Sequence, residues 1–115
     1  MRVWELVISF RVHGQVVEDE SGRPLASMLV RAFDKDVAFD DFLGEARTSD
    51  AGRFEVVFTD EQFKDFFESR PDLYLQVFDP SGSRLLYTTE REVRFNAGRE
   101  EFFEVRISRD RVLES

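Results

Sequence analysis

Strict alternation of apolar and polar residues is the feature that most constrains how this chain can fold. It is clearest in Arg53–Thr59 and in Leu73–Phe78, where every second residue is Phe, Val or Leu. Successive side chains of a β-strand point to opposite faces, so a period of two marks strands that bury one face and expose the other. The chain is therefore expected to be built from half-buried strands.

Seven segments carry this pattern, and clusters of Gly, Pro, Asp and Ser separate most of them. Strands that follow one another at intervals of about 8 to 12 residues, with no helix between most of them, are typical of two antiparallel sheets packed face to face. The sequence therefore predicts an all-β fold, a seven-stranded antiparallel β-sandwich. Its strands are expected at about Val3–Glu18, Ser27–Asp34, Phe42–Thr48, Arg53–Thr59, Leu73–Phe78, Arg84–Thr89 and Glu101–Ile107.

One segment breaks the alternation. Phe63, Phe66 and Phe67 recur at helical spacing, and Pro71 disfavours helical geometry in the residue before it. We therefore expect one short helix near residues 60–70.

The length of 115 residues fits one domain, because a chain of this size buries roughly 65% of its unfolded surface in a single core. Residues 1–115 are therefore expected to form one domain, with a polar tail at residues 110–115 that frays. No apolar stretch approaches the ~20 residues of a membrane span, and the apolar segment near the N-terminus is interpreted as a strand rather than a leader.

The charge balance narrows the kinds of partner. Sixteen basic and 24 acidic residues give a formal net charge of −8. This field repels nucleic acid and anionic lipid, and it attracts divalent cations and basic protein surfaces. We therefore expect neither nucleic acid nor a membrane as the usual partner. The lack of cysteine excludes disulfides and thiolate chemistry.

Several short motifs give the chain a family resemblance that covers nearly its whole length. They are Gly14–Val17, Gly22–Leu25, Val30–Asp34, Asp40–Gly44, Thr48–Phe54, Pro71–Leu75 and Phe95–Gly98. Together they resemble the transthyretin-like and carboxypeptidase regulatory-like superfamily, and the last two look like its bacterial members. The resemblance implies a prealbumin-like sandwich that serves as a structural or protein-binding module of a larger assembly.

Two enzymes are similar to this superfamily in architecture, and each needs residues that this chain lacks. The hydroxyisourate hydrolases use several histidines and a C-terminal Tyr-Arg-Gly-Ser motif, whereas His13 is the single histidine here and the motif is missing. Intradiol dioxygenases hold iron with two tyrosines and two histidines, whereas this chain offers Tyr74, Tyr87 and His13. We therefore expect no catalytic residues and interpret His13 as a half-exposed strand residue.

An acidic loop is the strongest candidate for a site. Asp34, Asp36, Asp40 and Asp41 place four carboxylates within eight residues, and Ca²⁺ requires several oxygen ligands at once. The string locally resembles the third calcium loop of synaptotagmin-type domains, which bind membranes. Strand counting places residues 60–72 and 90–100 at the same end, so further carboxylates are available there from Asp60, Glu61 and Asp72.

The alternative is a solvated, salt-bridged loop without metal. In that case Asp34 and Asp41 accept backbone N–H bonds at the strand ends. Basic residues then neutralise the remaining acids, the candidates being Lys35, Arg70, Arg91 and Arg94. Calcium is thus the one cofactor that the sequence suggests, and both interpretations stay open.

Two features bear on partners. Phe39 lies in the middle of the acidic loop, where it either plugs the end of the sandwich or is exposed as an anchor. The long first strand and the seventh strand are candidates for pairing with a second copy at a sheet edge, although their charged residues can equally block that pairing. The leading hypothesis is a non-catalytic spacer or protein-interaction module, and the alternative is a calcium-binding sandwich.

Overall fold

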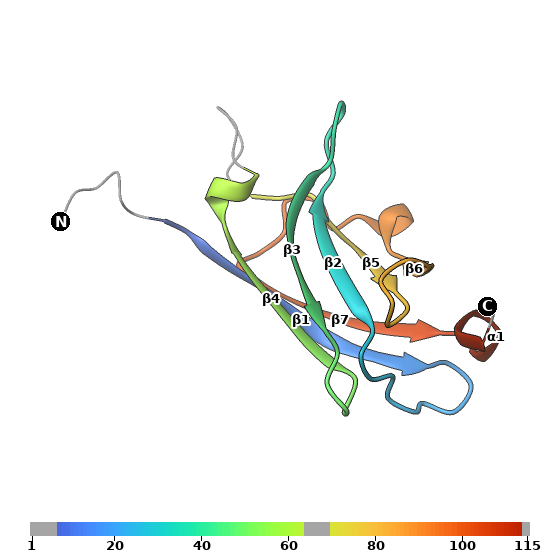
Figure 1. Ribbon diagram of the computed structural model, residues 1–115. Helices are drawn as coiled ribbons and strands as arrows, with labels where there is room; N and C mark the ends of the chain where they lie inside the picture. Colours follow the sequence, from blue (N-terminus) through green and yellow to red (C-terminus); the bar gives the residue numbers. More distant parts are fainter. Residues whose placement is uncertain (1–6, 64–69, 114–115) are drawn as a thin grey trace.

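The computed structural model describes residues 7–63 and 70–113, and it confirms an all-β fold (Figure 1). Seven strands lie in this part of the chain, and the bounds of β4 and β5 are those expected from the alternation. The strands are β1 (Ser9–Glu18), β2 (Leu29–Asp34), β3 (Asp41–Arg47), β4 (Arg53–Thr59), β5 (Leu73–Phe78), β6 (Leu85–Thr88) and β7 (Glu100–Ile107). Two 3₁₀ turns, η2 (Asp60–Gln62) and η3 (Glu90–Glu92), and one short helix, α1 (Arg109–Leu113), complete the fold.

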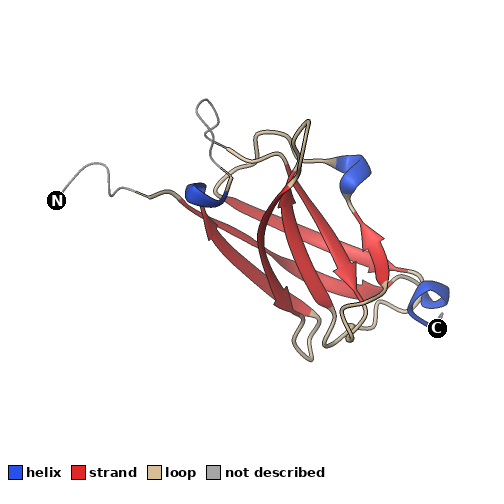
Figure 2. Ribbon diagram, turned by 45° about the horizontal axis from the view of Figure 1, so that its top comes forward, coloured by secondary structure: helices blue, strands red, loops and turns tan. Residues whose placement is uncertain are grey.

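The strands form two sheets (Figure 2). The strand order is β4-β1-β7 in one sheet and β3-β2-β5-β6 in the other. The expectation of purely antiparallel pairing is wrong for one pair, because β7 runs parallel to β1. The chain leaves β6 and stays at the same end of the molecule until β7 begins. This is also the end at which β1 begins, so the two strands point the same way, and the first link is the N–H of Arg11 donating to the carbonyl of Arg99 at 2.8 Å.

This topology also corrects the expected sheet edges. β1 lies between β4 and β7, so it has no free edge for pairing with a second copy. Of the two strands considered for that role, β7 is the one at an edge. One of its carbonyls, that of Phe102, accepts a hydrogen bond from the Arg94 guanidinium at 2.8 Å.

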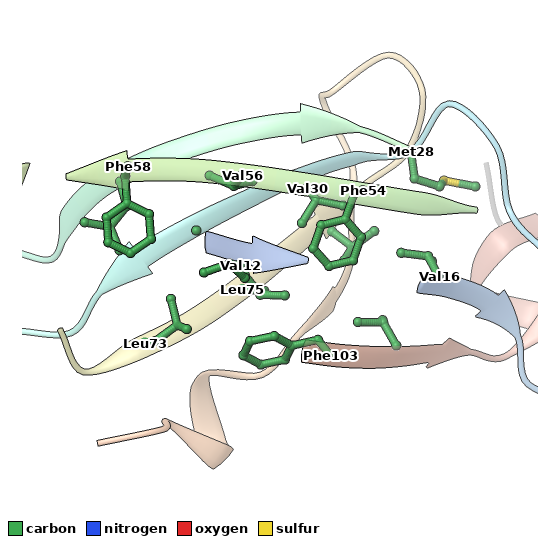
Figure 3. Packing of buried hydrophobic residues seen from close by; sticks show 14 of the residues in the cluster. Val12, Val16, Met28, Val30, Phe54, Val56, Phe58, Leu73, Leu75 and Phe103 are labelled. Carbon is green, nitrogen blue, oxygen red and sulfur yellow. The ribbon is translucent and has the colours of Figure 1, made fainter. Parts of the chain in front are cut away.

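The core lies between the sheets and is lined by the apolar face of each strand (Figure 3). Phe54, Val56 and Phe58 enter it from β4, and Leu73 and Leu75 enter it from β5, as the alternation predicts. Burying a side chain of this size contributes roughly 1.5–3 kcal/mol. This face is therefore what holds the two sheets together.

Gly14 allows β1 and β7 to approach each other. A Cβ at this position would lie 1.9 Å from the carbonyl oxygen of Phe103, a distance that real atoms do not adopt. Only a residue without a side chain permits the parallel pairing at this point.

The tail differs from the expected frayed segment, because residues 109–113 form α1. Its first residue, Arg109, donates to the Oε1 of Glu18 at 3.0 Å, and the Arg84 guanidinium donates to the Arg111 carbonyl at 3.0 Å. These bonds fix residues 110–113 against the end of the sheets, and residues 114–115 lie outside the described part.

Two further expectations are corrected or lie outside the described residues. The first strand begins at Ser9 rather than Val3, with Val7 and Ile8 partly exposed ahead of it, and residues 1–6 are not described. The helix expected near residues 60–70 is seen only as the 3₁₀ turn η2, and residues 64–69 lie outside the described part. None of the described helices is long and apolar enough to cross a membrane.

Candidate functional site

The acidic loop lies at the end of the molecule where β2 stops and β3 and β5 start, and we call this end the loop end. Figure 1 shows the loop between β2 and β3 projecting from the sheets. Residues 70–72 and 89–99 lie at the same end, because Lys35 pairs with Glu90, and Leu73 forms a bridge with Arg94. The strand-counting prediction is thus confirmed for these segments.

Asp34 closes β2 and is fully buried. Its Oδ1 accepts the backbone N–H of Asp72 at 2.7 Å, while the N–H of Lys35 donates to the carbonyl of Asp72 at 2.8 Å. These two bonds join the start of the acidic loop to the segment that leads into β5. Asp34 therefore accepts a backbone N–H at a strand end, as the interpretation without metal expects.

Asp40 is held by three donors. It accepts the backbone N–H of Asp36 at 3.0 Å and the Tyr74 hydroxyl at 2.5 Å, and the Lys35 ammonium lies 3.8 Å away. The Asp36 N–H and then the Tyr74 hydroxyl lower the pKa of Asp40 below its usual value. Burial, followed by the bond to Asp40, raises the pKa of Tyr74. At neutral pH Asp40 is an ionised anchor for the loop.

Lys35 neutralises part of the local charge, as one of the four basic candidates was expected to. Its ammonium donates to the Glu90 carboxylate at 2.7 Å and lies 5.9 Å from the centre of the Tyr74 ring. The bond to Glu90 raises the pKa of Lys35. This bridge connects the β2–β3 loop to η3.

Arg94 does not act as expected on the acidic loop. Its guanidinium bonds Glu101 at 2.9 Å and lies 3.6 Å from the centre of the Phe103 ring. It therefore braces the edge of β7 instead of neutralising the aspartates.

The four aspartates do not converge on one point. Asp34 is buried, Asp40 faces Tyr74, and Asp36 is exposed with its Oδ1 accepting the N–H of Val37 at 2.6 Å. Asp41 lies in β3 opposite Asp34. Among the residues described, no group of three or more His, Cys, Asp or Glu side chains is arranged to hold a metal ion.

The proposed helpers also have separate positions. Asp60 is buried beside β1, where its Oδ1 accepts the N–H of Ile8 at 3.4 Å, and Asp72 accepts the N–H of Asn96 at 2.9 Å. Carboxylates that each serve a different backbone group are poorly placed to share one cation. The calcium hypothesis stays a prediction, and the described geometry gives it no support.

The loop end exposes large apolar side chains beside a pocket. Phe39 is 84% exposed, Phe95 is 73% exposed and Val37 is fully exposed. Phe39 is therefore exposed and not a plug, and its role as an anchor for a partner stays a prediction. The pocket has a volume of about 680 Å³ and is lined by Lys35, Asp36, Val37, Asp72, Glu90, Val93 and Phe95.

Sequence reasoning missed Val93 and Phe95 as surface residues. Phe95 belongs to the Phe95–Gly98 motif, which was used only for the family resemblance. No signal in the sequence indicated this exposure, because Val93, Phe95 and Ala97 alternate with polar residues just as buried strand residues do.

The three residues that an iron enzyme of this architecture would use lie apart. His13 lies on the outward side of β1, edge-on to Phe102, with ring centroids 5.3 Å apart. Tyr74 stacks on Phe33 at 5.3 Å on the outward side of the other sheet, and Tyr87 packs against the core from β6. These side chains lie in different parts of the molecule and form no common ligand set.

Comparisons with known proteins bear mainly on the fold. No family model matches the chain, and no curated protein matches it. A 9R-lipoxygenase from Cyanothece PCC8801 is similar over 85% of this chain, at 25% identity and a TM-score of 0.65, and this chain covers 16% of that one.

A second similar structure is the dioxygenase domain of a dioxygenase and carbohydrate-binding protein fusion from Streptomyces sp. SirexAA-E. It matches 94% of this chain and 84% of its own at 15% identity, with a TM-score of 0.52. At that identity the likeness concerns the arrangement of the strands alone. In both matches the likeness is one of strand arrangement over the matched part of each chain.

Proposed function

We propose that this chain is a non-catalytic protein-binding or spacer module of a larger assembly, and that it contacts its partner through the loop end. The observation that carries the proposal is the exposure of Val37 and Phe95 at one pocket, together with the exposed Phe39 in the same loop as Val37. Exposed aromatic side chains beside a concave surface are common features of protein interfaces. Bonds between the loop and the sheet, such as that from the Tyr74 hydroxyl in β5 to Asp40, hold this surface in shape before binding.

The proposed fold family is the transthyretin-like, carboxypeptidase regulatory-like superfamily with its prealbumin-like sandwich. Its support comes from the sequence motifs and from the two-sheet architecture of seven strands. The similarity to about one sixth of a lipoxygenase chain is consistent with a module that occurs inside larger proteins.

The proposal assigns the chain no catalytic role, and the positions of its reactive groups support this. His13, Tyr74 and Tyr87 do not meet, and the perturbed groups at the loop end are bound to one another rather than directed at a substrate. Tyr74 and Asp40, for example, satisfy each other's polar atoms. An active site needs groups poised on a shared reacting atom.

A crosslinking experiment tests the proposal. A photoreactive residue at position 39, and separately at position 95, is expected to capture the same polypeptide from the native host. The same residue at position 57, which is exposed on the outer face of β4, is the matched control and is expected not to capture it.

The captured polypeptide must then bind the purified chain, and Phe39→Ser must weaken that binding about tenfold, as expected for an interface anchor. Equal capture from positions 39 and 57, or unchanged binding of the Phe39→Ser variant, would refute the proposal.

A further inference from the structure

We infer that the loop-end pocket receives a basic side chain, arginine or lysine, from an apolar segment of the partner protein. This inference rests on the proposed function, because it specifies the chemistry of the partner that the loop end contacts. Three observations carry it: the charge of the pocket lining, the nature of its walls and the field of the whole chain.

The charge of the lining is negative. Asp36, Asp72 and Glu90 carry three negative charges and Lys35 carries one positive charge, which gives +1 − 3 = −2. The Lys35 ammonium is engaged by Glu90 at 2.7 Å and lies 3.8 Å from Asp40, so its charge is already matched within the protein. Among the described residues no cation pairs with Asp36 or Asp72, so a cation that enters the pocket meets the charge of these two carboxylates.

The remaining residues of the pocket lining are apolar. Val37, Val93 and Phe95 line the pocket, and Phe95 presents an exposed ring. Arginine and lysine combine a long aliphatic stem with a charged head, so one residue can contact both kinds of surface. An aromatic ring also attracts a guanidinium or ammonium group placed over its face.

The size of the pocket suits a side chain with its neighbours. About 680 Å³ falls within the range of roughly 300–1,000 Å³ that is usual for ligand pockets. A single arginine does not fill it, so the flanking residues of the partner contribute. The exposed Phe39 and Val37 favour apolar residues on either side of the basic one.

The field of the whole chain points to the same partner. A net charge of −8 attracts a basic protein surface from a distance and repels the anionic face of a membrane. The apolar residues of the loop end are therefore assigned to a protein segment and not to a lipid surface.

The test is a titration of the ¹⁵N-labelled chain followed by NMR. The probes are three blocked peptides, acetyl-Leu-Arg-Leu-amide, acetyl-Leu-Gln-Leu-amide and acetyl-Leu-Glu-Leu-amide. We expect the arginine peptide to shift the amide signals of Asp36, Val37 and Phe95. It should bind at least about fivefold more tightly than the glutamine peptide, because a charge pair is lost in the latter.

Variants with matched controls locate the binding. Asp36→Asn and Phe95→Ser are each expected to weaken binding of the arginine peptide by about three- to tenfold. Asp50→Asn removes the same charge from an exposed turn at the far end, and Phe102→Ser removes a half-exposed ring from the outer face of β7. Neither control is expected to change binding.

Three outcomes would overturn the inference. These are equal binding of the arginine and glutamine peptides, an unchanged affinity in Asp36→Asn, and cosedimentation with phosphatidylserine vesicles that is lost in Phe95→Ser. A partner captured by crosslinking that binds without a basic residue would overturn this inference while leaving the proposed function intact. Binding of the arginine peptide without any captured partner would overturn the proposed function and leave the preference of the pocket for a basic side chain intact.

Discussion

The two ends of the molecule treat their charges in opposite ways. At the far end from the acidic loop, which we call the clasped end, Glu18 is buried and accepts bonds from Arg109 at 3.0 Å, Arg23 at 3.1 Å and Ser21 at 2.7 Å. At the loop end, Tyr74 bonds Asp40, and Lys35 bridges Asp40 and Glu90; we call these four bonded residues the frame of the loop end. Outside the frame, Val37, Phe39 and Phe95 are exposed. The polar groups of the clasped end bond distant segments of the chain to one another, whereas the loop end leaves apolar side chains exposed to solvent.

This difference shows where the chain tolerates change. The clasped end ties β1, the turn after it and α1 together, so its contacts join segments about 90 residues apart in sequence. The exposed side chains of Phe39 and Val37 do not join distant segments of the chain in this way. Substitutions at the clasped end should therefore affect folding, and substitutions at the surface of the loop end should affect binding.

The largest effect is expected from the turn glycine of the clasped end. Gly52 has a φ of +75°, and a Cβ there would lie 2.5 Å from the carbonyl oxygen of Val16. Gly52→Ala combines a left-handed backbone with a backbone clash and should cost about 3 kcal/mol of unfolding free energy. Urea denaturation measures this change.

Gly98 at the loop end is the matched control. A Cβ at Gly98 would lie 3.4 Å from the Oε2 of Glu101, which is an ordinary contact. Gly98→Ala should cost less than about 1 kcal/mol. An equal loss of unfolding free energy in Gly52→Ala and Gly98→Ala would contradict the view that the clasped end tolerates substitution less well than the loop end.

The next effect concerns the buried carboxylate of the clasped end. The Arg109 guanidinium, followed by the Ser21 hydroxyl, lowers the pKa of Glu18 from 4.5 to about 2. A carboxylate with a lowered folded-state pKa stabilises the fold above its ordinary pKa, and this contribution is lost as the pH falls from about 4.5 towards 2.

Thermal melts between pH 7 and pH 2 measure that contribution. Glu18→Gln should lower Tm by several degrees at pH 7, and the gap to the natural chain should close as the pH approaches 2. A gap that stays constant with pH would mean that the ionised carboxylate is not what closes this end.

A smaller effect is expected inside the frame of the loop end. Tyr74→Phe removes the hydroxyl that donates to Asp40, while the ring keeps its contact with Phe33. The loss of one hydrogen bond to a charged acceptor should cost about 1–2 kcal/mol in urea denaturation. An unchanged stability would show that the frame does not depend on this bond.

Alternation along the chain was sufficient to predict the strands and the core. The bounds of β4 and β5 and the burial of Phe54, Phe58 and Leu75 follow from a period of two. The direction of β7 could not be predicted in this way, because alternation determines which face is buried and contains no information about the neighbouring strand.

The candidate site was predictable in place but not in detail. Strand counting put the acidic loop beside residues 60–72 and 90–100, and the structure confirms this for residues 70–72 and 90–99. It could not show that Asp34 bonds the N–H of Asp72, 38 residues away, or that Asp40 bonds Tyr74. These contacts depend on where the backbone of Asp72 and the hydroxyl of Tyr74 lie in space, and they give Asp34 and Asp40 separate partners.

The smallest effect on stability should come from Phe39, which separates the two ends most sharply. The side chain is 84% exposed, so Phe39→Ser removes little buried area and should change the unfolding free energy by less than about 0.5 kcal/mol. The same variant should bind the crosslinked partner about tenfold more weakly, because an exposed aromatic ring becomes buried only in a complex. Urea denaturation and a binding titration on one preparation test both parts. A loss of stability comparable to that of Gly52→Ala would show that Phe39 belongs to the fold and not to a binding surface.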